Sequence, residues 1–136
     1  MTARRTAAAG VDYRLLAEFR FLQRQFLDFS ERAARKAGLT PQQHQALLAI
    51  RGSDGPPPSV GYLADQLLIR HHSAVGLANR LVAAGLLKRV ADAADRRRVT
   101  LAPTAKAEAL LAKLSSAHRD ELKRMAPTLR AILETL

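Results

Sequence analysis

The chain has 136 residues and carries 22 Lys+Arg against 12 Asp+Glu, a formal charge of +10 at pH 7. Its apolar fraction of 48% is enough to form one folded core, which excludes an intrinsically disordered chain. Without cysteine there is no disulfide framework, no thiolate metal site and no cysteine nucleophile. The apolar runs are too short for a membrane span, and residues 1–5 lack the apolar block of a secretory signal, so we expect a cytoplasmic protein with no membrane partner.

The positive charge indicates a polyanionic partner such as DNA. The excess is spread along the chain, with one local focus at Arg96-Arg97-Arg98. The alternative interpretation is a basic protein without such a partner. Alanine and leucine far outnumber β-branched residues, which favours a mainly helical fold.

The first ten residues show no apolar periodicity, and we expect them to be disordered. One long helix is predicted over residues 11–37, where apolar residues recur at steps of four and three, an unbroken seam along one face. The seam comprises Leu15, Phe19, Leu22, Phe26, Phe29 and Ala33. Phe21 and Leu27 lie off it, which indicates a second contact such as another subunit. Gly38 is the expected stop.

A second helix is predicted to begin with Thr40 as its N-cap and Pro41 as its first residue. We expect it to bury Leu47, Leu48 and Ile50 and to end near Gly52. Residues 53–58 contain a glycine followed by three prolines, which cannot continue a helix.

The spacing of the next two helices is that of a helix-turn-helix. Ser59 is expected to cap a short helix, and residues 68–70 form the break. The second helix is predicted over residues 71–84, with Gly85 as its stop.

A two-stranded antiparallel hairpin is predicted next, from residues 86–91 and 97–101, with the arginines beginning the return strand. Thr104 is expected to cap a last long helix. Pro127 is expected to break or kink that helix near Ala126, ahead of a terminal helix. The predicted fold is mainly α with a small β-hairpin, a winged helix-turn-helix between long flanking helices.

This layout suits DNA, because a helix fits the major groove and a basic hairpin tip reaches the narrower minor groove. Five polar residues are predicted on the outer side of the second helix, and each is able to hydrogen-bond a base edge or a phosphate. They are His71, His72, Ser73, Asn79 and Arg80. The alternative is a polar helix face that merely contacts solvent.

An ordered set of short motifs resembles the MarR family of bacterial winged-helix transcription regulators. The set comprises Leu39-Thr40-Pro41, Leu63-Ala64-Asp65-Gln66-Leu67, Leu77-Ala78-Asn79-Arg80-Leu81-Val82, Gly85-Leu86-Leu87, Asp95-Arg96-Arg97 and Thr104. The resemblance runs from about Leu39 to Leu111 and extends more loosely through both flanking helices.

The resemblance implies a homodimer on a pseudo-palindromic double-stranded DNA operator. Residues 11–37 and 104–136 would form the dimerisation region, and residues 38–103 the DNA-binding winged helix. It also implies a repressor that is relieved by a small effector, often a phenolic or other aromatic anion.

The site residues follow from the same resemblance. His71, His72 and Ser73 would meet base edges, and Arg96 or Arg97 would enter the minor groove. Arg70 and Arg98 complete the basic set, and Asp95 would orient the wing by pairing with a nearby arginine, for which we expect Arg80.

The chain departs from the family pattern at several positions. Leu68 stands where the turn usually has glycine, which strains the backbone if φ is positive. Gly76 stands where a polar or basic contact residue is common, and Pro103 and Ala107 replace the usual leucine and glycine. Gly76 lends some support to an alternative function, a protein-interaction module that has lost specific DNA binding, whereas the intact arginine run opposes it.

No constellation of residues indicates an enzyme, a cofactor or a metal. His71 and His72 are adjacent in a helix and point about 100° apart, so they do not chelate one ion as an i, i+4 pair does. His44 lies on the second helix, between the long helix and the winged unit, and is our candidate for a ligand pocket.

Overall fold

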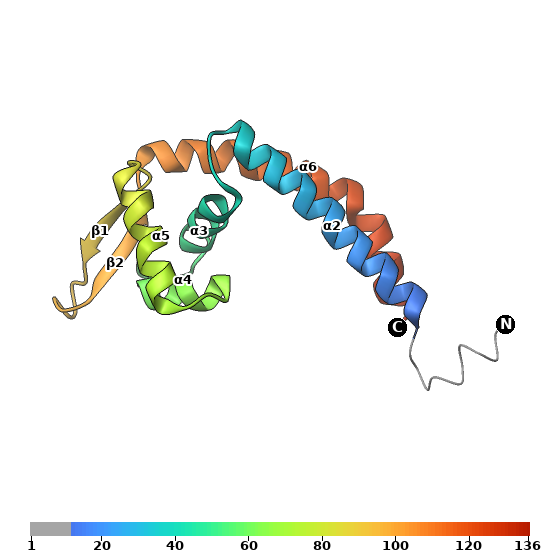
Figure 1. Ribbon diagram of the computed structural model, residues 1–136, viewed down its shortest axis with the longest axis horizontal. Helices are drawn as coiled ribbons and strands as arrows, with labels where there is room; N and C mark the ends of the chain where they lie inside the picture. The colour runs from blue at the N-terminus through green and yellow to red at the C-terminus, as the bar shows by residue number, and fades with distance from the viewer. Residues whose placement is uncertain (1–11) are drawn as a thin grey trace. The chain divides into compact units, whose positions relative to one another are not determined.

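A computed structural model describes residues 12–136, so the expectation of disorder over residues 1–10 lies outside the described residues. The described chain begins with one long helix, which is followed by three shorter helices, a pair of strands and a second long helix (Figure 1). The elements are α2 (Tyr13–Lys36), α3 (Pro41–Arg51), α4 (Val60–Leu67), α5 (His71–Ala83), β1 (Leu87–Ala91), β2 (Val99–Pro103) and α6 (Ala105–Glu134). The two strands form an antiparallel hairpin, which confirms the predicted fold class. No helix in this part of the chain is both long and apolar enough to cross a bilayer.

The described chain forms two compact units, residues 33–115 and residues 12–32 with 116–136. The first has a core of fully buried leucines contributed by α3, α4, α5 and both strands. They are Leu47, Leu63, Leu77, Leu81, Leu87 and Leu101. Strand β2 is hydrogen-bonded on both sides: it pairs with β1, and the Leu101 N–H donates to the Pro58 carbonyl at 2.8 Å. The hairpin is therefore anchored to the segment that leads into α4.

Helix α3 begins as predicted. The Thr40 hydroxyl accepts a hydrogen bond from the Gln43 backbone N–H at 3.1 Å, and the Gln43 side chain accepts one from the Thr40 N–H. The prediction of which α3 residues are buried was wrong at Leu48. Leu48 is 42% exposed, and His44 and Ala46 are buried instead.

Three helices of residues 33–115 end in the same backbone motif. Each has one residue of positive φ after the helix, and the next N–H donates to the carbonyl five residues earlier: Leu39 to Ala34 at 2.9 Å, Ile69 to Ala64 at 3.0 Å and Leu86 to Leu81 at 2.9 Å. The positive-φ residues are Gly38 (87°), Leu68 (56°) and Gly85 (74°). This is the Schellman ending, in which glycine is favoured because a Cβ crowds the following carbonyl. The condition under which Leu68 strains the backbone, a positive φ, is therefore met.

Helix α6 is continuous from Ala105 to Glu134 with Pro127 inside it, so of the break or kink expected near Ala126 the break, with a separate terminal helix, was wrong. Pro127 removes the N–H that would bond the Lys123 carbonyl, and its ring crowds that carbonyl. Pro127 and Lys123 are both exposed, on the side of the helix away from buried Met125, so the carbonyl lies where solvent has access to it.

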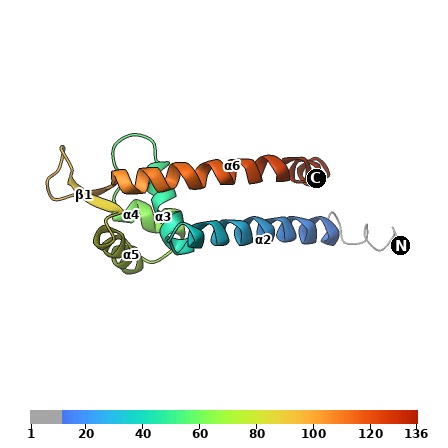
Figure 2. The same cartoon turned by 90° about the horizontal axis from the view of Figure 1, so that it is seen from above.

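In the second unit, residues 13–32 of α2 and 116–134 of α6 lie side by side and antiparallel (Figure 2). Leu22, Met125 and Ile132 are buried between them. At one end the His118 Nε2 lies 2.8 Å from the Ser30 hydroxyl, and the imidazole contacts the rings of Phe26 and Phe29 edge-on. The long helix and its seam are confirmed.

Candidate nucleic-acid interface

The helix-turn-helix consists of α4 and α5. The Ser59 hydroxyl accepts from the Tyr62 N–H at 3.2 Å and caps α4, as predicted. Helix α5 buries Ala74, Leu77, Ala78 and Leu81, and this apolar stripe fixes which side faces out. The outward side carries the five predicted polar residues, all of them exposed: His71, His72, Ser73, Asn79 and Arg80.

The N-terminal end of α5 is electropositive. Arg70 is its N-cap, with an extended backbone and no side-chain hydrogen bond to the first turn, and the first turn holds no acidic residue. The unpaired N–H groups and the helix dipole both favour a negative group at this end. Arg70, His71 and His72 are all exposed there.

The hairpin tip, residues 92–98, is held by two aspartates. The Asp92 carboxylate accepts from the Ala94 N–H at 2.9 Å, and the Asp95 carboxylate accepts from the Arg97 N–H at 3.0 Å. Because these side chains satisfy the backbone of a loop, β2 begins only at Val99. The expectation that the arginines begin the return strand was therefore wrong, since Arg96, Arg97 and Arg98 all lie in the loop.

Asp95 also pairs with the Arg97 side chain, at 3.2 Å from Nε, rather than with Arg80 as expected. The Arg97 side chain and backbone N–H, with the charge of Arg98, hold the pKa of Asp95 below its usual value. Arg98 lies 4.0 Å from an Asp92 oxygen. Within residues 12–136 no carboxylate forms an ion pair with Arg96, which leaves its charge uncompensated at the tip.

Arg89 is a candidate residue that the sequence interpretation missed. It is exposed on β1, and its guanidinium donates to the Asn79 Oδ1 on α5. A signal was present in the sequence, because Lys88-Arg89 places two cations directly after the apolar pair Leu86-Leu87 that ends the helix-turn-helix.

Gly76 lies on α5 between the polar positions and is half-buried. A Cβ placed there would meet only the end of the Arg80 side chain, at 3.4 Å. The position therefore has room for a larger residue. With glycine there, α5 lacks a side chain at this position that would contact DNA.

The positive charge is concentrated in the unit that contains these residues. Residues 33–115 carry 12 Lys+Arg against 5 Asp+Glu, whereas residues 12–32 with 116–136 carry 8 against 7. Residues 33–115, which contain the winged helix, thus have a formal charge of +7. Residues 12–32 with 116–136, the helical pair, are close to neutral.

The remaining histidines contribute little to this surface. His44 is 1% exposed on α3, in the core of residues 33–115, and its predicted role in a ligand pocket stays a prediction. No group of three or more His, Asp or Glu side chains in residues 12–136 is arranged to hold a metal ion.

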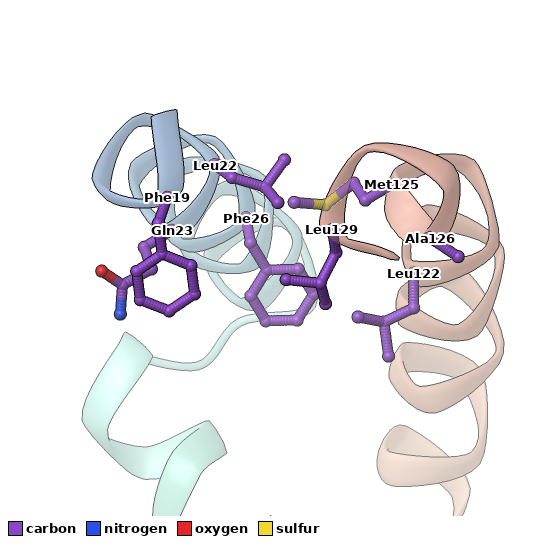
Figure 3. Close-up of a pocket in the computed structure, with 8 residues that line it drawn as sticks. All are labelled: Phe19, Leu22, Gln23, Phe26, Leu122, Met125, Ala126 and Leu129. Atoms are coloured by element: carbon purple, nitrogen blue, oxygen red, sulfur yellow. The ribbon is translucent and has the colours of Figure 1, made fainter. Parts of the chain in front are cut away.

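A cavity of about 390 Å³ lies instead in the helical pair (Figure 3). Gln23 is the one polar side chain in its lining, which otherwise consists of Phe19, Leu22, Phe26, Leu122, Met125, Ala126 and Leu129. The sequence interpretation did not foresee this cavity, because its walls come from residues about 100 positions apart.

Solved structures with this fold include DNA-bound and ligand-bound proteins. The Staphylococcus aureus MepR–DNA complex is 20% identical, with a TM-score of 0.64 over 86% of this chain and 96% of that chain. CouR from Rhodococcus jostii, bound to p-coumaroyl-CoA, is 19% identical, with a TM-score of 0.66 over 82% of each chain. The multiple antibiotic-resistance repressor MarR from Listeria monocytogenes is 27% identical, with a TM-score of 0.65 over 87% of this chain and 78% of that chain.

No curated protein matches the chain in sequence. The sequence model of the MarR family matches residues 37–98, which span α3, α4, α5, β1 and the wing tip. Residues 37–98 are therefore a winged helix of the MarR family, and the chain has the fold of the MarR-family transcription regulators.

Proposed function

We propose that this protein is a dimeric, sequence-specific DNA-binding transcription regulator. The observation that carries the proposal is the coincidence of charge and shape. An exposed polar face on α5 and a loop of three arginines belong to the same unit, and that unit holds most of the chain's excess positive charge. MepR, which shares the fold, is solved in complex with DNA.

In this proposal α5 enters the major groove and the wing tip enters the minor groove. His71, His72 and Ser73 meet base edges, because they occupy the first turn of the helix. Arg70 and Arg80 contact phosphates. Arg96 is the arginine that enters the minor groove, because the neighbouring Arg97 is already engaged by Asp95.

The dimer is assigned to α2 and α6. Leu16 and Leu27 on α2, and Leu122 and Leu133 on α6, are each at least half exposed. Leu27 and Leu133 lie four residues beyond the cavity-lining Gln23 and Leu129, so they extend the apolar wall of the cavity along the same helix faces. A second copy would cover this surface, which a monomer would leave in water.

Light scattering tests the dimer at micromolar concentration. A dimer is expected for the wild type, and Leu27→Glu with Leu133→Glu is expected to give monomers, because charges would be buried without partners. Arg32→Glu is a matched control that should stay dimeric, because Arg32 is exposed and lies nine residues after Gln23, on the opposite side of α2. A stable wild-type monomer would overturn this part of the proposal.

We further propose a repressor that a small aromatic ligand relieves, with His44 as a ligand contact. CouR, which shares the fold, is solved with p-coumaroyl-CoA bound. Titration with p-coumaroyl-CoA should release the protein from DNA and shift the NMR signals of the His44 imidazole. Release without a change at His44 would move the ligand site elsewhere.

Selection of DNA from a random pool, followed by sequencing, tests the central proposal. The expected result is a motif of two inverted half-sites, because a two-fold dimer presents two copies of α5. Recovery of no motif, together with binding that is equal on all duplexes, would favour the alternative of a protein-interaction module.

A further inference from the structure

The contact between Arg89 and Asn79 joins the wing to the helix assigned to the major groove. The two residues are ten positions apart, one on β1 and the other near the last turn of α5, and both are exposed. The Arg89 guanidinium donates to the Asn79 Oδ1. In residues 12–136 no carboxylate forms an ion pair with Arg89, so the amide is the partner that orients it.

The chemistry of the two groups determines how the Asn79 amide is turned. A guanidinium has N–H donors and no acceptor, so only the oxygen edge of the amide is able to face it. The Nδ2 group is then directed away from Arg89. A charged donor also makes a stronger hydrogen bond than a neutral one, which holds the amide in this orientation.

This orientation changes what Asn79 reads. An asparagine that recognises adenine uses both edges of its amide, with Oδ1 accepting from N6 and Nδ2 donating to N7. Arg89 takes one of the two lone pairs of Oδ1 and places a positive charge beside it, which disfavours the approach of a second donor such as adenine N6. The Nδ2 donors stay available and match guanine, whose major-groove edge carries the two acceptors N7 and O6.

We propose that Arg89 is a specificity-determining positioning residue: by holding the Asn79 oxygen it makes Asn79 favour guanine and disfavours the paired contact with adenine. The inference rests on the proposed DNA-binding function and deepens it. Arg89 acts through Asn79 and does not itself touch the base.

The test compares the motifs selected by the wild type, Arg89→Ala and Lys88→Ala. Lys88 is the matched control, because it is also an exposed cation on β1 but does not contact Asn79. In Arg89→Ala the preference for guanine over adenine at one position of each half-site should fall by at least fivefold, and adenine should rise. Lys88→Ala should weaken binding to all duplexes evenly and keep the motif.

A second comparison separates positioning from a loss of charge. In an Asn79→Ala background, Arg89→Ala should leave the base preference unchanged, because no amide remains to be oriented. Both side chains are exposed, so the variants should melt at the wild-type temperature.

The outcomes are distinguishable. If the wild type selects no motif, the proposed function fails and this inference fails with it. If the wild type selects a motif that Arg89→Ala leaves unchanged, the inference alone is overturned. The same holds if Lys88→Ala alters the preference at that position as strongly as Arg89→Ala does.

Discussion

Replacement of Leu68 by glycine should stabilise this protein, although leucine is the larger apolar residue. Leu68 adopts φ 56° in the turn between α4 and α5, and its side chain is 92% exposed. The equivalent residues after α2 and α5 are Gly38 and Gly85, with the same hydrogen bonds. The chain therefore provides two internal examples of the residue that this backbone favours.

The expected gain follows from two opposing contributions. A left-handed conformation costs a residue with a Cβ roughly 1–2 kcal/mol, which the substitution removes. Glycine loses more backbone freedom on folding, which costs roughly 0.5–1 kcal/mol. Almost no buried apolar area is lost, because the leucine is exposed. The net expectation is a gain of roughly 0–1.5 kcal/mol in the free energy of unfolding.

Urea unfolding at a fixed protein concentration measures this difference, since the stability of a dimer depends on concentration. Gly38→Leu is the matched reverse change: a Cβ there meets nothing within 4 Å, so only the positive φ opposes it. It should lose about as much stability as Leu68→Gly gains. A Leu68→Gly protein that is less stable than the wild type would refute the reasoning and would mean that the exposed leucine makes a contact of its own.

Four further predictions concern DNA and the wing. DNA affinity should fall steeply with salt, with a log–log slope of roughly −5 to −7 if a dimer neutralises about six to eight phosphates; a slope shallower than about −2 in fluorescence anisotropy would contradict this. Ser73→Ala should relax one base position per half-site, whereas Arg96→Ala should weaken specific and random duplexes alike, and competition binding on both duplexes separates the two effects. The Asp95–Arg97 contact should be intact at pH values above the usual aspartate pKa and should be lost only as the pH falls through the lower pKa that Asp95 has in the folded state. An NMR titration of the Arg97 amide with a midpoint above the usual aspartate pKa would contradict this. Gly76→Ala should raise the free energy of unfolding by roughly 0.5–1 kcal/mol, because alanine favours a helix and the added Cβ meets only a flexible side chain; thermal melting that shows a loss would contradict this.

Local chemistry made the winged helix predictable from the sequence. The caps at Thr40 and Ser59, the stops at Gly38 and Gly85 and the apolar seam of α2 all depend on neighbours within about one helical turn. Such neighbours are adjacent whatever the tertiary structure is. The exposed polar face of α5 followed from the same periodicity.

Tertiary structure decided the features that depend on contacts between elements. The arginines lie in the wing loop because the Asp92 and Asp95 side chains satisfy its backbone, and a strand pattern does not register such bonds. His44 is buried on α3 while Leu48, one turn later on the same side, is 42% exposed, because the neighbouring elements cover only part of that side. Arg89 meets Asn79 only because β1 packs against α5. Periodicity specifies which way a side chain points from its own element, but the partner it meets there is set by how the elements pack together.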